Sequence, residues 1–160
     1  MILREIKAKD DEALFFLVRR CLEQAHLDIP GTAYFDESIK NMSHFYLNNS
    51  WRKYFVLADE DDKVLGGAGF AEFNGNFQTA ELQKLYIDDR AKGKGYSYKL
   101  IEKVELEAKQ AGFKTLYLET HHNLPVAIHI YKKLGYTQLP CPLPGTEHNT
   151  MDYFFVKELL

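Results

Sequence analysis

The sequence predicts an α/β sandwich built on a mixed, mostly antiparallel sheet flanked by helices. Apolar runs of strand type alternate with runs of helical spacing, in the order strand, two helices, three strands, helix, strand, helix, two strands. Asn74-Gly75-Asn76 is a strong hairpin signal, so the strands on either side are expected to pair antiparallel. A glycine-rich turn from Lys92 to Ser97 separates an apolar strand from a helical run.

The N-terminal part of the chain is expected to form a strand, two helices and a second strand. Aspartates can cap both helices, because their carboxylates accept hydrogen bonds from the free N–H groups of a first helical turn. The expected segments are a strand over 2–6, a helix from Asp10 or Asp11 to about Gln24, a loop over 26–35, a helix from Asp36 to about Asn48, and a strand over 54–58. The helical spacing is carried by Ala13, Leu14, Leu17, Val18, Cys21 and Leu22 in the first helix and by Ile39, Met42, Phe45 and Tyr46 in the second.

The rest of the chain begins with an acidic turn over 59–62 and then alternates strands with helices. A glycine can close each helix as a C-cap, and a proline fits the start of the last helix. The expected segments are strands over 64–73 and 77–87, a helix over 97–111 closed by Gly112, a strand over 115–119, a helix from Pro125 to Leu134 closed by Gly135, and strands over 136–139 and 151–156.

Composition limits the class of protein. The chain of 160 residues is expected to form a single domain over 1–160, and its 46% hydrophobic and 27% charged content is ordinary for a globular protein. The net charge of -3 argues against nucleic acid or anionic lipid as a partner. Cys21 and Cys141 form no metal or redox motif, which favours reduced thiols and a cytoplasmic location. No signal-peptide core or membrane-spanning run is recognised.

The turn from Lys92 to Ser97 carries the main indication of function. Gly93 and Gly95 allow positive φ angles, and their amides can approach an anion closely. The helix that begins after them adds unpaired N–H groups and the positive end of its dipole. Lys92 and Lys94 add positive charge. The turn therefore predicts a site for the pyrophosphate of a phosphorylated cofactor.

Two stretches in this order resemble the GNAT-type N-acetyltransferase family. Leu85-Tyr86-Ile87 followed by Lys92-Gly93-Lys94-Gly95-Tyr96-Ser97 is similar to the family's motif A, Gln/Arg-x-x-Gly-x-Gly/Ala, with Lys at the first position and Ser at the last. The run from Ala127 to Tyr136 is similar to motif B, in which a helix carrying a tyrosine is followed by Gly-Phe or Gly-Tyr. The family's asparagine near the start of this helix falls one place off, at Asn123.

The resemblance implies an enzyme that moves an acetyl group from acetyl-CoA to a primary amine of a small molecule or peptide, by direct attack in a ternary complex. It also implies that strands 82–87 and 115–119 run parallel and splay apart at their C-terminal ends, which leaves an opening for the pantetheine arm. It assigns cofactor binding to Leu85, Tyr86, Ile87, Lys92, Gly93, Lys94, Gly95, Tyr96, Ser97, Asn123 and Tyr131. Dimerisation is common in that family, so a homodimer is a further expectation.

Three residues are candidates for catalysis, since acyl transfer to an amine needs a base for the amine and a proton for the leaving thiolate. Tyr131 is the candidate acid, with packing in the core as the alternative. Glu81 is the first candidate base, and Glu119, at the end of the other splayed strand, is its rival. Strand alternation places Glu81 on one face with Gln83, Leu85 and Ile87.

The acceptor site is expected between the loop over 26–36, the second helix and the loop over 140–149. Aromatic and acidic side chains in the first of these suit a cationic amine, namely His26, Asp28, Tyr34, Phe35, Asp36 and Glu37. His148 and Asp152 are further candidates for lining the acceptor pocket. His121 and His122 are adjacent and have no evident third ligand, so no metal is expected.

Two other classes of function stay open at this point. A non-catalytic acyl-CoA-binding module or sensor would need the cofactor turn but neither Glu81 nor Tyr131, and release of free CoA would separate it from an enzyme. A nucleotide-binding protein of the P-loop or dinucleotide type is disfavoured. The turn lacks a Gly-Lys-Ser/Thr ending, and no Gly-x-Gly-x-x-Gly follows the first strand.

Overall fold

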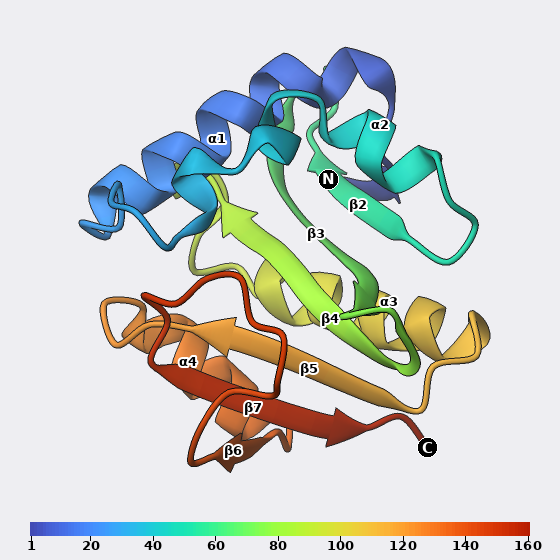
Figure 1. Ribbon diagram of the computed structural model, residues 1–160. Helices are drawn as coiled ribbons and strands as arrows, with labels where there is room; N and C mark the ends of the chain where they lie inside the picture. The colour runs from blue at the N-terminus through green and yellow to red at the C-terminus, as the bar shows by residue number, and fades with distance from the viewer.

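The computed structural model describes residues 1–160, and one seven-stranded sheet with the strand order β1-β2-β3-β4-β5-β7-β6 forms its centre (Figure 1). The strands are β1 (Ile2–Glu5), β2 (Lys53–Ala58), β3 (Val64–Phe73), β4 (Asn76–Ile87), β5 (Thr115–Thr120), β6 (Thr137–Leu139) and β7 (Tyr153–Glu158). The α-helices are α1 (Asp11–Gln24), α2 (Met42–Leu47), α3 (Tyr96–Gln110) and α4 (Pro125–Lys133). Short 3₁₀ helices cover Ala8–Asp10, Ala33–Phe35, Glu37–Lys40 and Asp89–Ala91. Every predicted strand is present, and the mixed, mostly antiparallel sheet is confirmed.

Strands β4 and β5 are the one parallel pair of the sheet. Their backbones pair from Thr79 opposite Thr115 to Glu81 opposite Tyr117, and the strands then diverge (Figure 1). Beyond this point β4 keeps its pairing with β3, and β5 keeps its pairing with β7. The splayed parallel pair is therefore confirmed, with the paired part just before Leu82 and the opening beyond it.

The helices cover both faces of the sheet. Helices α1 and α2 lie on one face and α3 and α4 on the other (Figure 1). The face with α3 and α4 holds the larger core, whose helical members include Leu100, Ile101, Val104 and Ile130. Burying an apolar side chain of this size stabilises a fold by about 1.5–3 kcal/mol. Each helix is thus fixed against the strands that carry the site. No helix in the structure has the length and apolar character needed to cross a membrane.

Glycines inside β3 make room for the ring of Tyr54 on β2. A Cβ added to Gly67 would lie 2.5 Å from that ring, and one added to Gly69 would lie 2.6 Å from it. The hydroxyl of Tyr54 donates a hydrogen bond of 2.7 Å to the carbonyl oxygen of Lys84 on β4. The glycines therefore serve close packing, and the tyrosine fixes the backbone at an irregular point of β4.

That irregular point is a β-bulge at Lys84, and it overturns one prediction. Lys84 has a φ of 51°, and the register between β3 and β4 shifts between the Gly69–Gln83 and Gly67–Tyr86 pairs. An extra residue in one strand reverses which face the following side chains occupy. Glu81 and Gln83 do share a face, as predicted. The prediction that Leu85 and Ile87 share it is wrong, since both pack in the core on the α3 side.

Asp10 is the N-cap residue of α1, and Asp36 is that of the 3₁₀ turn Glu37–Lys40, but no aspartate makes the predicted capping hydrogen bond, because each carboxylate is engaged elsewhere. Asp10 accepts hydrogen bonds from the Arg4 guanidinium at 2.8 and 2.9 Å, and Asp11 accepts bonds from the backbone and hydroxyl of Ser43. Asp36 accepts a bond from a histidine in the loop before β7. The segment predicted as one helix from Asp36 is instead a 3₁₀ turn followed by the short α2, with Asn41 in a non-helical conformation between them.

Candidate active site

A groove opens where the C-terminal end of β4 diverges from β5. The turn after β4 and the first turns of α3 and α4 form its walls. Predicted cofactor residues that line it are Leu85, Tyr86, Ile87, Lys92, Gly93, Gly95, Tyr96, Ser97 and Asn123. Lys94 does not line the groove, because its ammonium donates a hydrogen bond to the carbonyl oxygen of Arg90 at 3.0 Å.

The turn has the geometry of an anion site. Gly93 and Gly95 have φ angles of 74° and 80°, and no atom lies within 4 Å of a Cβ built on either residue. Glycine is therefore required by the backbone conformation and not by crowding. Gly95 is the N-cap of α3, and no side chain caps the helix. The first N–H groups of α3 are thus free for an anion. The charge of Lys92 is shared with Asp89, whose carboxylate lies 2.8 Å from its ammonium.

The groove continues into a central cavity that holds all three candidate catalytic residues. Tyr131 enters it from α4, Glu81 from β4 and Glu119 from β5. Cys21, Leu85, Tyr86, Leu124 and Ala127 line both spaces and connect them. The splay of the parallel strands is the physical reason for this arrangement, since the diverging strand ends leave the space between their side chains unfilled.

Tyr131 has a hydroxyl that no protein group binds. The residue is 5% exposed, and burial alone raises its pKa well above the usual range, so the hydroxyl stays protonated. Its ring packs against those of Tyr136 and Phe155. The ring of Tyr131 therefore packs in the core, as the alternative interpretation predicts, while its hydroxyl has no protein partner and the residue lines the cavity.

Glu81 and Glu119 differ in their surroundings. The carboxylate of Glu81 accepts one hydrogen bond of 2.8 Å from Gln83, whose own oxygen accepts a bond from Tyr46. Burial raises the pKa of Glu81 against the effect of the Gln83 hydrogen bond, and the negative charge of Glu119 raises it further. Glu119 accepts bonds from the hydroxyls of Tyr117 at 2.7 Å and Thr146 at 2.8 Å.

A second cleft opens on the far side of these carboxylates. It is lined by the 3₁₀ turn before α2, the β3–β4 hairpin and the loop before β7. Residues shared with the central cavity are Glu81, Gln83, Lys84, Glu119 and His148. His148 lies 2.8 Å from Asp36, and that hydrogen bond raises the pKa of His148. The loop between β6 and β7 rises in front of β5 toward this turn (Figure 1).

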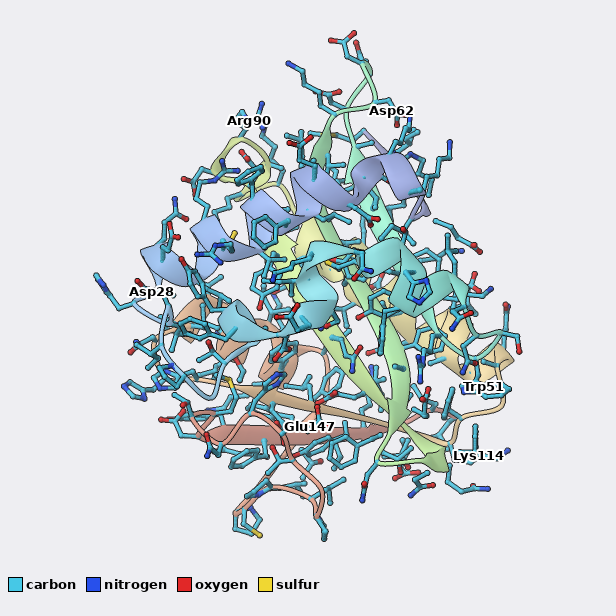
Figure 2. All side chains as sticks on the ribbon, turned by 45° about the horizontal axis from the view of Figure 1, so that its top comes forward. Asp28, Trp51, Asp62, Arg90, Lys114 and Glu147 are labelled. Carbon is cyan, nitrogen blue, oxygen red and sulfur yellow. The ribbon has the colours of Figure 1, made fainter.

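The structure brings only part of the predicted acceptor region to this cleft. Asp36, Glu37 and His148 line it, whereas His26, Asp28, Tyr34, Phe35 and Asp152 do not. Glu147, which the sequence did not single out, lies on the loop at the cleft (Figure 2). The acidic turn that ends at Asp62 projects from the sheet well away from Glu147 (Figure 2).

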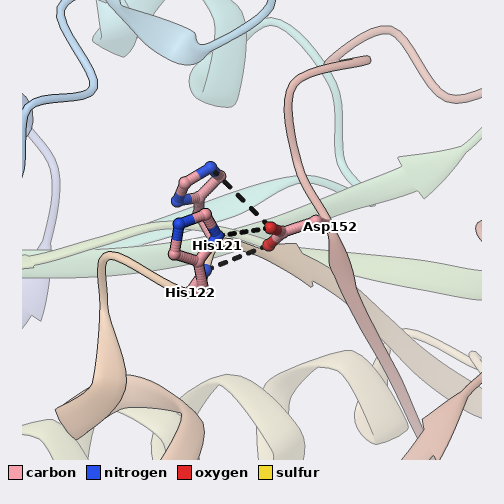
Figure 3. Close-up of side chains that lie close together, drawn as sticks. All are labelled: His121, His122 and Asp152. Atoms are coloured by element: carbon pink, nitrogen blue, oxygen red, sulfur yellow. Dashed lines mark hydrogen bonds and ion pairs between the residues drawn. The ribbon is translucent and has the colours of Figure 1, made fainter.

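Asn123 and the adjacent histidines hold strand and helix ends in place. The Asn123 side chain donates a hydrogen bond of 2.9 Å to the carbonyl oxygen of Ala25, just after α1. His122 Nδ1 lies 2.5 Å from an oxygen of Asp152, at the point where β7 begins (Figure 3). His121 Nε2 lies 3.9 Å from the same oxygen. His121, His122 and Asp152 therefore link the end of β5 to the start of β7.

This cluster does not fit a metal ion. Nδ1 of His121 accepts a hydrogen bond of 3.0 Å from the backbone N–H of Asn123, so a neutral ring carries its proton on Nε2. Nε2 is the nitrogen that faces Asp152 (Figure 3). A metal ligand needs that nitrogen unprotonated and normally donates a hydrogen bond from the other one. In His121 the other nitrogen, Nδ1, faces the backbone N–H of Asn123 and cannot donate such a bond, which opposes binding of a metal ion.

Two residues at the centre of the site were missed by the sequence reasoning. Gln83 orients Glu81, and Lys84 places an ammonium between the cavity and the second cleft. Both residues could have been found as site candidates, because they are the polar side chains inside the run from Leu82 to Ile87, which is otherwise apolar or aromatic. A charged residue inside such a strand is rarely buried without a reason.

Comparison with known proteins gives one consistent result. The family model described as the acetyltransferase (GNAT) family matches residues 12–136. The uncharacterized N-acetyltransferase YjgM of Escherichia coli (strain K12) is 29% identical over 160 residues, which covers 99% of this chain and 95% of the relative.

Solved structures agree with that result at the level of the fold. An acetyltransferase of the GNAT family from Staphylococcus aureus Mu50 superposes with a TM-score of 0.86 at 17% identity, covering 99% of both chains. The acetyltransferase yncA from Salmonella typhimurium, solved with its cofactor acetyl-CoA, gives a TM-score of 0.77 at 20% identity and covers 100% of this chain and 94% of that one.

Proposed function

The chain belongs to the acetyltransferase (GNAT) family, and from this premise we propose that it transfers the acetyl group of acetyl-CoA to a primary amine by direct attack in a ternary complex. The observation that carries the proposal is the free hydroxyl of Tyr131 in the same cavity as Glu81 and Glu119. That cavity joins the groove at the turn after β4 on one side. On the other side it joins the second cleft, called the acidic cleft below because Asp36, Glu37, Glu81, Glu119 and Glu147 line it.

Acetyl-CoA fits the groove by the chemistry of its walls. The free N–H groups of Gly95 and the first turn of α3 suit the pyrophosphate, with Lys92 beside them. The edge of β4 at Leu85 and Ile87 suits the pantetheine amides. A solved relative of this fold holds acetyl-CoA as its cofactor. When bound, acetyl-CoA supplies an activated acetyl group as a thioester.

We assign Glu81 as the general base and Tyr131 as the general acid. An acceptor ammonium must lose a proton before its nitrogen can attack, and Glu81 takes this proton directly or through a water. The negative charge of Glu119 helps to raise the pKa of Glu81, which makes Glu81 a stronger base than an ordinary carboxylate. The hydroxyl of Tyr131 is kept protonated by burial and donates its proton to the departing sulfur.

Release of CoA thiol in the presence of acetyl-CoA and a panel of primary amines tests the proposal. A rise in melting temperature with acetyl-CoA and CoA, but not with NAD, reports binding by mass action. Binding together with amine-dependent CoA release is the expected result. Binding without release for any amine would instead indicate the non-catalytic acyl-CoA-binding module, and no binding would overturn both.

The compartment is a further part of the proposal. Cys21 and Cys141 are both free thiols in the structure. Unpaired cysteines fit a reducing compartment, so we propose a cytoplasmic location. Oxidised thiols in protein isolated under conditions that trap the cellular redox state would oppose it.

A further inference from the structure

Lys84 lies at the junction of the central cavity and the acidic cleft, and lines both. Its backbone is held in the left-handed region, with a φ of 51°, by the bulge in β4 and the hydrogen bond from Tyr54. Only a few per cent of residues other than glycine adopt positive φ, and such positions cluster at functional sites. The bulge adds Lys84 to the face that carries Glu81 and Gln83.

Lys84 is the exception among the partly buried lysines of this chain. There are four such lysines, and Lys53, Lys103 and Lys157 each lie within 3.0 Å of a glutamate. The side-chain ammonium of Lys84 forms no hydrogen bond or ion pair with any protein group. A lysine that served only stability would be expected to pair as the other three do.

The other cations of the cleft are already engaged by carboxylates. His148 is held by Asp36, and Arg52 is held by Glu72 in a bidentate ion pair. Lys84 therefore differs from the other two cations of the cleft, because no carboxylate of the protein contacts its ammonium directly. Burial lowers its pKa, whereas the charges of Asp36, Glu81 and Glu147 act in the opposite direction and favour the ammonium form.

We propose that Lys84 binds a carboxylate carried by the acceptor, so that the preferred acceptor is a zwitterion with its amine and carboxylate close together, of the α-amino-acid class. The inference rests on the proposed function, because it places the acceptor amine at Glu81. Glu81 and Lys84 lie three residues apart on β4 and line the same two spaces. One short zwitterion can then present its ammonium to the carboxylates and its own carboxylate to Lys84.

The test compares matched pairs of acceptors that differ only in the α-carboxylate. L-Leucine is assayed beside isoamylamine, and L-ornithine beside putrescine, within a panel of amino acids and their decarboxylated amines. We expect kcat/KM to be at least about tenfold higher for the carboxylated members that are accepted, since a hydrogen-bonded charge pair is worth about that factor or more. Preference for putrescine and other amines without a carboxylate would overturn the inference.

Variants at Lys84 show whether this residue produces the preference. Lys84→Met keeps the length and removes the charge, so it should raise KM for the amino acids relative to KM for the decarboxylated amines. Lys84→Arg should restore the preference in part. Lys63→Met removes an exposed lysine that lines neither the central cavity nor the acidic cleft and is the control, with no change expected. A carboxylate preference that survives Lys84→Met would overturn the assignment.

A binding measurement separates failure of this inference from failure of the proposed function. Melting temperatures are measured with CoA and each amino acid, for the wild type and Lys84→Met. A rise with amino acids that depends on Lys84 supports carboxylate binding even if no acetyl transfer is detected, and the missing transfer then counts against the proposed function alone. No rise with any amino acid counts against the inference.

Discussion

Tyr131 differs from every other buried tyrosine of this molecule. The hydroxyls of the other four donate hydrogen bonds to protein acceptors, and these residues are Tyr46, Tyr54, Tyr117 and Tyr136. A buried hydroxyl normally finds a partner, because leaving it unpaired costs about 1–3 kcal/mol. The structure leaves no buried polar side-chain atom unpaired, so the hydroxyl of Tyr131 is open to the cavity, where water or a substrate can bind it.

Replacing Tyr131 with Phe should slow turnover without weakening acetyl-CoA binding. Loss of a general acid lowers kcat by roughly 10²–10⁴-fold, and the phenyl ring keeps the packing against Tyr136 and Phe155. Tyr136→Phe is the matched control, since it removes a hydroxyl bonded to Glu105 outside the cavity. Steady-state kinetics and thermal shift with acetyl-CoA measure both variants. An unchanged kcat in Tyr131→Phe would remove the residue as the acid.

The pair Glu81 and Glu119 predicts the pH dependence of the reaction. Glu81 must be ionised to accept a proton, so kcat/KM should fall as pH drops through its raised pKa. Glu119→Gln removes the neighbouring negative charge that raises this pKa, and the acidic limb of the profile should therefore move to lower pH. Glu81→Gln should lose most of the activity. A limb that stays in place or moves upward in Glu119→Gln would contradict Glu81 as the base.

At the scale of single elements, α3 offers two glycines for a matched experiment. Gly95 precedes the helix with a φ of 80°, and Gly112 follows it with a φ of 100°, and neither has an atom within 4 Å of an added Cβ. Replacing either with Leu strains the backbone by about 1–2 kcal/mol, so both variants should melt at similarly lower temperatures. Only Gly95→Leu should lose the rise in melting temperature with acetyl-CoA. Equal rises in both variants would contradict the pyrophosphate site.

Strand β4 contains one feature that local sequence patterns predicted and one that they could not predict. Its ends follow from the hairpin at Asn74-Gly75 and from its apolar pattern, and both were predicted. The bulge at Lys84 depends on Tyr54, which lies 30 residues away and reaches the strand only because Gly67 and Gly69 leave space for its ring. One extra residue changed the face of every side chain beyond it. Periodicity alone could not supply that contact.

Across the whole molecule, the sequence pattern predicted the order of elements and the family resemblance implied the splayed pair, while long-range partners decided the details of the site. Asp36 was expected to cap a helix, but it bonds His148, which lies 112 residues later. The distinction between Glu81 and Glu119 depends on Gln83, Tyr117 and Thr146 as hydrogen-bond donors. Candidate residues could be named from motif and spacing, whereas their protonation and orientation required the fold.

Ion pairs spread over the fold predict that the protein loses stability in acid. The hydrogen bond from Arg90 lowers the pKa of Asp88 from 3.8 to about 2, and Lys9 and Arg4 lower that of Asp62 to about 2. A carboxyl group whose pKa is depressed by folding stabilises the native state above its unfolded pKa, and that contribution is lost as pH falls toward 2. For Asp88, whose side chain is 7% exposed, the contribution is about 2 kcal/mol.

Urea unfolding between pH 7 and pH 2 measures this loss. The free energy of unfolding should fall between about pH 4 and pH 2, and less steeply in Asp88→Asn than in the wild type. Glu81 has the opposite sign, because its raised pKa means that folding favours the protonated form. The stabilisation of the native state by Glu81 is therefore present at pH values below its unfolded pKa, and it is lost as pH rises through the raised pKa of the folded state. Glu81→Gln should then be at least as stable as the wild type at pH 7 while it loses activity. Equal slopes in Asp88→Asn and the wild type would show that the Arg90 and Arg20 contacts of Asp88 contribute nothing to the acid limb.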